Sequence, residues 1–257
     1  WWIFLGKIRY SWWTKKYLVL LFELKESFPA YYRYYGRRIA KRLSPSLNKI
    51  FENSYKKFSI DEDVLKIISD KKADKKYSLN QDFKKQIIEI GFGDGDHLLS
   101  QVQCNKDIHY IGCEVFVNGL GKVLKKIIDL NLENIKLCGL NCLYLLNSLE
   151  NSSIDQIFII NPDPWEKKRH FKRRLINKEF ISLLYKKIKK GGNVMITTDS
   201  SSYYNYISEI SKSKEIEFEK IQENQLNPGD ILYDISKYQK KGIYKGRKIH
   251  LVELSKI

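Results

Sequence analysis

The sequence predicts an α/β fold built on a mostly parallel, doubly wound sheet with helices on both faces. From residue 86 onward, short apolar runs alternate with stretches of helical periodicity. The run 154–160, IDQIFII, is apolar enough for a strand that is covered on both faces. Repeated strand–helix units connect parallel strands through crossover helices. We therefore expect one domain over 86–257, which is enough chain to bury a single core.

Each predicted element has its own signal in this pattern. Apolar or alternating runs predict strands over 86–90, 108–115, 134–138, 154–160, 193–198, 215–221 and 248–254. Helices are expected over 97–102, 119–130, 142–149 and 175–189. In the second of these, Leu120, Val123, Leu124 and Ile127 recur at helical spacing. Gly191 and Gly192 are expected to end the last helix.

The first 85 residues differ in composition from the predicted domain. Residues 1–27 hold four of the five tryptophans, and the apolar run 17–22 is too short to span a bilayer. We expect an extension of unknown order there, and whether it belongs to the natural protein stays open. Residues 28–85 form a predicted basic arm and linker. Arginines alternate with tyrosines over 31–42, which suits phosphate contacts or a solvated tail, and 60–85 is expected to be a linker or loop.

The overall charge narrows the possible partners. Lys and Arg number 46 against 30 Asp and Glu, a formal net charge of +16. Such an excess favours nucleic acid or an anionic membrane, unless it is a lysine bias spread over a solvated surface. No stable membrane association is expected. The four cysteines form no C-x-x-C pair and the histidines are scattered, so we expect reduced thiols, no metal and a cytoplasmic protein.

A glycine-rich turn follows the first strand of the predicted domain. The segment 89–95 reads Glu-Ile-Gly-Phe-Gly-Asp-Gly, and the second strand ends at Glu114. Alternating glycines let the chain turn tightly and bring backbone N–H groups close to a ligand. An acid at the next strand end can accept hydrogen bonds from ribose hydroxyls. On these residues alone the ligand is either a nicotinamide dinucleotide or S-adenosyl-L-methionine, although Gly95 lies one residue early for the dinucleotide pattern.

This E-x-G-x-G-x-G turn with its following acid resembles the class I S-adenosylmethionine-dependent methyltransferases. The resemblance implies a Rossmann-like fold and S-adenosyl-L-methionine as the cofactor. It also implies a set of cofactor-binding residues, namely Glu89, Gly91, Gly93, Gly95, Glu114, Asn141 and Asp163. Asn141 follows the third strand, where it either contacts the adenine or is an ordinary loop residue.

The segment after the fourth strand, 161–174, reads NPDPWEKKRHFKRR. Two prolines bracket Asp163 and stiffen the loop that carries its carboxylate. The segment resembles the P-D-P-W-x-K-K-R-H-x-K-R-R signature of the tRNA (guanine-N7-)-methyltransferase family. Further similar pieces lie at 35–38, 42–45, 111–115 and 198–203, so the resemblance covers roughly 28–254. It implies methylation of N7 of a guanine in tRNA, at guanine 46 of the variable loop.

The resemblance also assigns roles to residues of this chain. Asp163 is expected to be catalytic, because a rigid carboxylate favours the positive charge that methylation places on the base. The expected substrate-binding residues are Lys167, Asp199, Ser236, Lys237, Tyr238, Gln239, Lys172, Arg173 and Arg174. Three departures stand out, because the family more often has Phe at Asn161, Glu166 interrupts the basic run, and Gln239 replaces an acid.

Other functions remain open from the sequence. Exocyclic-amine methyltransferases of RNA or DNA carry an N-P-P-[YFW] loop after the fourth strand, which N-P-D-P-W resembles with one insertion. An RNA-binding protein that has lost catalysis is a second alternative, although Glu89, Glu114 and Asp163 are all present. The misplaced Gly95 disfavours a nicotinamide oxidoreductase. The oligomeric state, monomer or homodimer, is not predicted.

Overall fold

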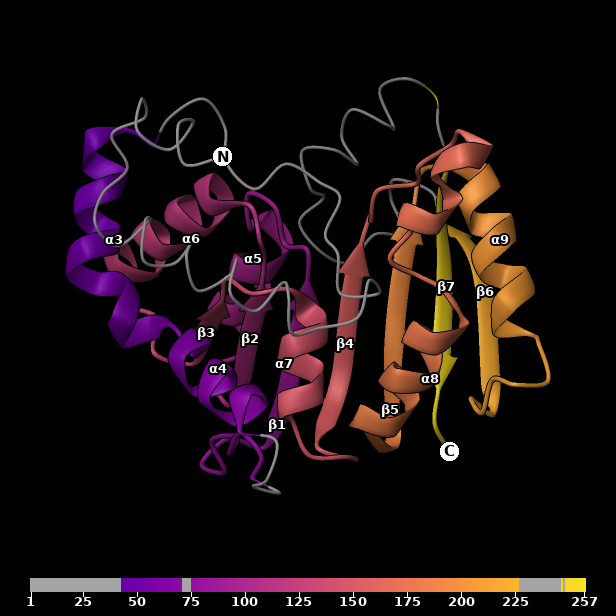
Figure 1. The fold of residues 1–257 in the computed structure, drawn as a ribbon, viewed down its shortest axis with the longest axis horizontal. Coiled ribbons are helices and arrows are strands. Elements are labelled where there is room, and N and C mark those ends of the chain that lie inside the picture. The colour runs from indigo at the N-terminus through magenta and orange to yellow at the C-terminus, as the bar shows by residue number, and fades with distance from the viewer. Residues whose placement is uncertain (1–42, 71–74, 227–245, 247) are drawn as a thin grey trace.

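The computed structural model describes residues 43–70, 75–226, 246 and 248–257. These residues form a central sheet with helices packed against both of its faces (Figure 1). The predicted extension 1–27, the arm up to residue 42 and the predicted substrate residues Ser236, Lys237, Tyr238 and Gln239 lie outside the described residues.

The sheet has seven strands in the order β3-β2-β1-β4-β5-β7-β6. The strands are β1 (Lys85–Ile90), β2 (Ile108–Cys113), β3 (Ile135–Cys138), β4 (Ile154–Ile160), β5 (Ile188–Thr198), β6 (Lys220–Leu226) and β7 (Ile249–Ser255). β1 to β5 pair in parallel, whereas β7 runs antiparallel to both β5 and β6. The chain order reverses between β1 and β4, which is the switch point where ligands bind in open α/β sheets.

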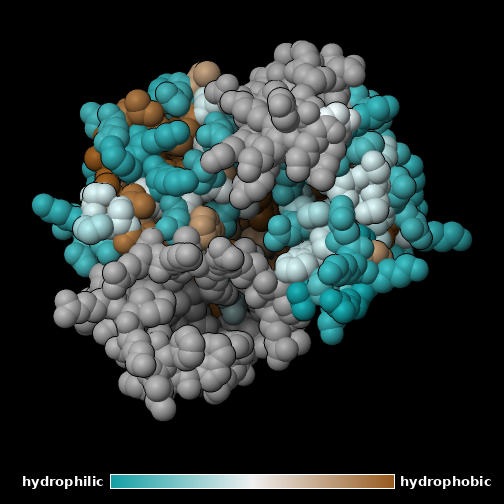
Figure 2. All heavy atoms as spheres, turned by 90° about the horizontal axis from the view of Figure 1, so that it is seen from above, coloured by the Kyte–Doolittle hydropathy of each residue, from teal (hydrophilic) through white to brown (hydrophobic). Residues whose placement is uncertain are grey.

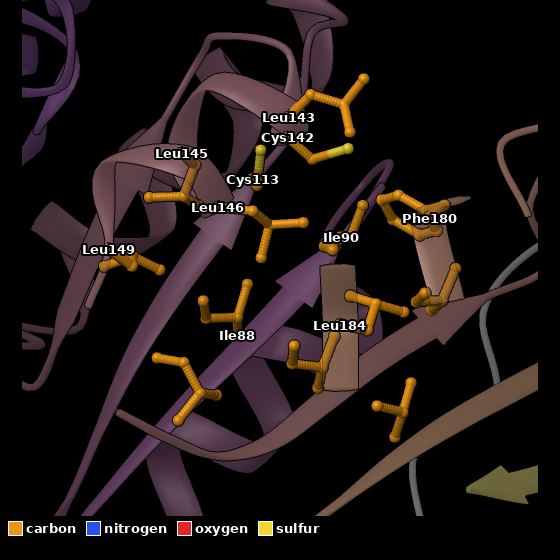
Figure 3. Close-up of a cluster of buried hydrophobic side chains, with 14 of the residues drawn as sticks. Ile88, Ile90, Cys113, Cys142, Leu143, Leu145, Leu146, Leu149, Phe180 and Leu184 are labelled. Atoms are coloured by element: carbon orange, nitrogen blue, oxygen red, sulfur yellow. The ribbon is translucent and has the colours of Figure 1, made fainter. Parts of the chain in front are cut away.

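Two hydrophobic cores hold the helices to the sheet. One face packs against α4 (Asp61–Ser69), α7 (Cys142–Ser148), α8 (Lys178–Lys187) and α9 (Ser201–Ser211). The other face packs against α3 (Pro45–Phe58), α5 (Asp96–Cys104) and α6 (Val117–Asp129). β1 contributes to both, since Ile88 and Ile90 point toward α7 and α8 (Figure 3) while Ile87 joins the opposite core. A central strand buried on both faces explains its nearly continuous apolar sequence.

Several sequence predictions of secondary structure are wrong in detail. Within the expected linker, residues 61–69 form α4, whose Val64 and Leu65 are buried in the core. The helix expected over 175–189 begins at Lys178, because the Asn177 side chain caps it by accepting from the Phe180 N–H at 2.8 Å. The strand expected over 215–221 begins later, at Lys220.

Gly191 and Gly192 were expected to end a helix, but they lie inside β5. Ile154 pairs with Ile188 and Gln156 with Asn193, so extra β5 residues loop out between these two pairs. Gly191 has a φ of +80°, a conformation that glycine adopts without strain. The glycines therefore accommodate an irregularity in the strand rather than a helix end.

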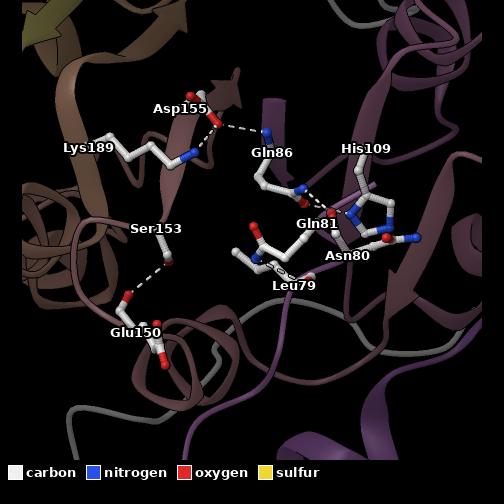
Figure 4. Close-up of polar contacts among 9 residues, drawn as sticks. All are labelled: Leu79, Asn80, Gln81, Gln86, His109, Glu150, Ser153, Asp155 and Lys189. Atoms are coloured by element: carbon white, nitrogen blue, oxygen red, sulfur yellow. Dashed lines mark hydrogen bonds and ion pairs between the residues drawn. The ribbon is translucent and has the colours of Figure 1, made fainter. Parts of the chain in front are cut away.

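Polar contacts tie the strands together at the amino-terminal edge of the sheet (Figure 4). Asp155 accepts from the Gln86 backbone N–H and from the Lys189 ammonium, both at 2.8 Å. His109 Nδ1 lies 2.9 Å from Gln86 Oε1, and burial lowers the pKa of His109 to about 4. These partners account for the polar residues at this edge, which lies opposite the candidate site.

Candidate active site

The candidate site lies at the carboxyl ends of the parallel strands, the upper edge in Figure 1. Four strand ends carry its residues. The glycine turn follows β1, Glu114 follows β2, the Asp163 loop follows β4 and Asp199 follows β5. Parallel pairing from β2 through β5 brings these ends to one edge.

The glycine turn after β1 borders open space. Gly91 and Gly93 have φ angles of +76° and +58°, which side chains rarely adopt. A Cβ added at either position would meet no atom of the described residues within 4 Å. The described residues therefore leave the backbone accessible at these two glycines, and their contact with a cofactor stays a prediction.

Gly95 and Gly119 serve packing instead. A Cβ at Gly95 would lie 2.2 Å from Val123 Cγ2, so this glycine faces α6 and not the open space that Gly91 and Gly93 border. A Cβ at Gly119, on α6, would lie 2.3 Å from the Gly93 carbonyl oxygen. The two glycines let α6 pack directly against the turn. Gly119 was not among the predicted site residues, since its contact is distant in sequence.

Glu114 fixes the shape of the turn. Its Oε2 accepts from the Gly93 N–H at 2.9 Å and its Oε1 accepts from the Phe116 N–H at 2.9 Å. The residue is 9% exposed. Burial raises the pKa of Glu114, and the negative charge of Asp163 raises this pKa further. The Glu114 carboxylate therefore lies where water is partly excluded.

Glu89 lies beneath the turn, where its observed partner is His97. The Glu89 carboxylate and His97 Nδ1 are 2.6 Å apart, and each residue is only 2% exposed. The His97 ring also packs edge-on against Phe158 with centroids 4.7 Å apart. Direct contact of Glu89 with a cofactor remains a prediction. Sequence reasoning placed His97 on a helix but missed this pair, because the contact spans a turn.

Residues that precede the predicted domain bind the loop after β3. Asn141 caps α7, its side-chain oxygen accepting from the Leu143 N–H at 3.0 Å. The Gly139 N–H donates to Asp61 Oδ1 at 2.8 Å, and the Tyr55 hydroxyl donates to Asp61 Oδ2 at 2.8 Å. Burial raises the pKa of Asp61 to about 6. Asp61 belongs to the segment expected to be a linker, so no pattern in the sequence indicated that it would lie here.

The Asp163 loop has an unusual backbone. Asn161 and Trp165 have φ angles of +50° and +44° without being glycines. The Asn161 N–H donates to the Thr197 carbonyl at 3.0 Å, which anchors the loop to β5. Asp163 reaches solvent, yet the surrounding protein removes enough water to raise its pKa. The loop thus presents a carboxylate in a partly dehydrated position at the strand ends.

The basic run divides into exposed and buried parts. A 3₁₀ helix, η2, spans Lys168–Arg173. The exposed cations in and beside it are Lys167, Lys168, Arg169 and Lys172. Arg173 is half-buried, with its guanidinium carbon 5.0 Å from the Trp165 ring centroid.

Figure 2 looks onto the carboxyl ends of the strands from above. The half of this face that carries β5, β7 and β6 is largely hydrophilic.

Arg174 departs from the sequence prediction. It was expected to contact tRNA phosphates, but it is only 5% exposed. Its Nε–H donates to the Pro164 carbonyl oxygen at 2.8 Å. Asp199, by contrast, is half-buried at the end of β5, on the same edge as the Asp163 loop.

Metal sites and membrane-spanning helices are both absent from the described part of the chain. No three His, Cys, Asp or Glu side chains within it gather as a metal site would require. Over the same residues, no helix combines the length and apolar character needed to cross a membrane.

Similar proteins place this site in a family. A family model described as "Putative methyltransferase" matches residues 84–252. The tRNA (guanine-N(7)-)-methyltransferase of Wolbachia pipientis wMel is 32% identical over 220 residues, which cover 84% of this chain and 89% of that protein. The chain belongs to the tRNA (guanine-N7-)-methyltransferase family. A "Bifunctional methyltransferase" of Rickettsia typhi is 36% identical over 216 residues, and this chain spans only 39% of its length.

The family assignment agrees with the fold. The solved structure of a mutant 16S rRNA (adenine(1408)-N(1))-methyltransferase from Catenulisporales acidiphilia matches with a TM-score of 0.50 and 10% identity. The match covers 70% of this chain and 95% of that chain. At this identity it concerns the fold alone. Together with the strand order it confirms the expected Rossmann-like class I methyltransferase fold.

Proposed function

We propose that this chain transfers the methyl group of S-adenosyl-L-methionine to N7 of a guanine in tRNA. The position that the family resemblance implies is guanine 46 of the variable loop. One observation carries the proposal. In a chain related to tRNA (guanine-N(7)-)-methyltransferases, Asp163 lies in the loop after β4 and Glu114 directly follows β2, at the same edge of the parallel sheet.

The residues after β1 and β2 fit the cofactor. At Gly91 and Gly93, no atom of the described residues occupies the position where a Cβ would stand. The backbone of these two glycines would therefore contact the cofactor closely. Glu114 would accept from the ribose hydroxyls, and Asn141 at the start of α7 would lie near the adenine. Bound S-adenosyl-L-methionine supplies a methyl group on a positively charged sulfur.

The reaction does not require the protein to remove a proton from the substrate. Guanine N7 has an in-plane lone pair and carries no proton at neutral pH, so no general base is needed. The protein must align N7 with the methyl group for in-line displacement. Methylation leaves positive charge on the base, and the Asp163 carboxylate would stabilise the transition state electrostatically. Partial dehydration of Asp163 strengthens such an interaction.

The exposed cations beside the Asp163 loop would hold the tRNA. Lys167, Lys168, Arg169 and Lys172 are exposed on the same edge of the sheet. Phosphate contacts of this kind position the RNA without reading its sequence. Lys167 follows Asp163 in the same loop, and Asp199 directly follows β5. We expect these two side chains to contact the tRNA close to the reacting guanine.

Mass spectrometry of nucleosides tests the proposal. The protein is incubated with unmodified tRNA and isotopically labelled S-adenosyl-L-methionine, and the tRNA is then digested to nucleosides. We expect label in 7-methylguanosine. Label in N2-methylguanosine or N6-methyladenosine would assign the chain to the exocyclic-amine methyltransferases. Binding of tRNA with no labelled nucleoside would indicate an RNA-binding protein without catalysis.

A further inference from the structure

We infer that Arg174 is a positioning residue that fixes the loop carrying Asp163, and that it does not bind tRNA phosphates. The inference rests on the proposed role of Asp163. Arg174 ends the basic run, which the sequence assigned as a whole to RNA binding. Its surroundings differ from those of the exposed cations Lys168, Arg169 and Lys172.

Arg174 is bonded directly to the loop. Its Nε–H donates to the carbonyl oxygen of Pro164, the residue after Asp163, at 2.8 Å. This carbonyl belongs to the peptide bond that leads into Trp165, whose φ of +44° is strained for a bulky residue. A hydrogen bond from a cation is stronger than a neutral one and suits the task of holding such a backbone.

Aromatic rings surround the guanidinium of Arg174. Its central carbon lies 3.8 Å from the Phe171 ring centroid, 4.8 Å from that of Tyr203 and 4.9 Å from that of Tyr206. Cation–π contacts of this kind are favourable for a planar guanidinium away from water. None of the ion pairs between described residues involves Arg174. Among the described residues, the observed partners of the Arg174 guanidinium are these rings and the Pro164 carbonyl.

The rings connect the loop to a second part of the site. Tyr203 and Tyr206 lie on α9, which begins just after Asp199. The Tyr203 hydroxyl also accepts from the Ile176 N–H at 3.2 Å, two residues beyond Arg174. Arg174 thus lies between the Asp163 loop and the helix that follows Asp199. By this assignment the position of the Asp163 carboxylate depends on Arg174, which is buried and does not bind the RNA.

Lysine cannot perform this role. A lysine ammonium keeps the positive charge but lacks the planar fork that donates to one carbonyl while stacking on rings. A phosphate contact, in contrast, tolerates either cation. The Arg174→Lys variant therefore separates a positioning role from a phosphate-binding role.

Steady-state kinetics test the inference with Lys172 as the matched control. We expect Arg174→Lys and Arg174→Met to lower kcat for tRNA methylation by about 10²-fold, the size of effect that a misplaced catalytic group produces. KM for tRNA should change less than threefold, roughly, since neither variant removes a phosphate contact. Lys172→Met should instead raise KM for tRNA, and Lys172→Arg should restore it. A raised KM with unchanged kcat in Arg174→Met, or full activity in Arg174→Lys, would overturn the inference.

Fluorine NMR provides a readout that does not depend on turnover. Protein labelled with 5-fluorotryptophan gives a Trp165 resonance, identified by its loss in Trp165→Phe. We expect this resonance to shift or broaden in Arg174→Lys and to stay in place in Lys172→Met. An unmoved resonance in Arg174→Lys contradicts the inference. If Arg174→Met does not fold, Tyr206→Leu removes one ring and should move the same resonance.

The two proposals fail in different ways. If wild-type protein forms no 7-methylguanosine, the proposed function is wrong, while the Trp165 resonance still reports whether Arg174 holds the loop. If wild-type protein is active and Arg174→Lys equals it, only the positioning role is wrong.

Discussion

Asp163 lies between Pro162 and Pro164 at the end of β4, and its neighbours define its environment. The Asp163 side chain is exposed, yet desolvation by the neighbouring protein raises its pKa, and its negative charge contributes to the raised pKa of Glu114. Both effects come from water exclusion, since Coulomb interactions strengthen where the effective dielectric constant falls. The proposed catalytic role of Asp163 is therefore electrostatic.

The first prediction isolates that charge. Asp163→Asn keeps the shape of the side chain, so it should fold, bind tRNA and lose turnover by about 10²–10³-fold, as expected when a transition-state electrostatic contact is removed. Initial rates at saturating tRNA and cofactor measure the loss. Glu166→Gln, an exposed position in the same segment, is the control and should retain activity. Equal rates for Asp163→Asn and wild type would remove Asp163 from the reaction.

The second prediction concerns Asp61 and stability. Its pKa of about 6 in the folded state exceeds the ordinary value of 3.8, so the folded protein binds more protons between these pH values. The free energy of unfolding therefore falls as pH rises from about 4 to about 6. Asp61→Asn removes this titration. Relative to wild type, its free energy of unfolding should rise by about 2 kcal/mol between pH 4 and pH 7.

Urea unfolding of both proteins at the two pH values measures this difference. Asp63→Asn is the control, because Asp63 is exposed on the same helix and its Oδ1 lies 3.8 Å from the Lys66 ammonium. Comparing variants also cancels the opposite contribution of His109, whose pKa is lowered. A stability difference for Asp61→Asn that is the same at pH 4 and pH 7 would show that Asp61 does not titrate in this range.

At the scale of elements, α6 sets the shape of the cofactor turn. Gly119→Ala would place a Cβ 2.3 Å from the Gly93 carbonyl oxygen, which is backbone and cannot swing away. We expect cofactor affinity to fall at least about tenfold, the effect of losing roughly 1.4 kcal/mol of binding. Isothermal titration calorimetry with S-adenosyl-L-methionine measures it.

Gly121→Ala is the control for this prediction. It makes the same substitution on the same helix, but its Cβ faces Phe51 of α3 at 2.9 Å. We expect it to change thermal stability and to leave cofactor affinity near the wild-type value. If both variants bind the cofactor like wild type, the contact between α6 and the turn is not important for binding.

The elements also show where sequence reasoning succeeds and fails. β4 spans 154–160 as predicted, because a strand buried on both faces has a continuous apolar sequence. α4 was missed, since its polar sequence buries few residues and those pack on the distant α7. The strand ends that carry the site were predicted from motifs. The contacts of Asp61, His97, Gly119 and Arg174 were not, because each depends on a partner brought close only by folding.

At the scale of the molecule, the two edges of the sheet have different roles. The amino-terminal edge is closed by polar contacts among Gln86, His109, Asp155 and Lys189. The carboxyl-terminal edge carries the open glycine turn, the Asp163 loop and the exposed cations. The chain has a strong net positive charge, and we expect the cations at the carboxyl-terminal edge to contribute more to tRNA binding than those at the amino-terminal edge.

A comparison of the two edges provides the fourth prediction. Changing Lys168, Arg169 and Lys172 to glutamine should weaken tRNA binding and reduce its salt dependence by about one slope unit for each phosphate contact removed. Changing Lys84, Lys106 and Lys190 to glutamine removes the same charge from the opposite edge. Filter binding at several salt concentrations compares the two triple variants. Equal effects would mean that total charge, and not this surface, holds the tRNA.

In the proposed reaction, the chain methylates a guanine of tRNA at N7. The product, 7-methylguanine, carries a positive charge that weakens its glycosidic bond. Borohydride reduction followed by aniline treatment therefore cuts the RNA at that nucleotide. End-labelled tRNA should be cut at guanine 46 only after incubation with the protein and S-adenosyl-L-methionine. Methylated tRNA that resists scission would contradict the N7 assignment, because N2-methylguanosine and N6-methyladenosine do not cleave.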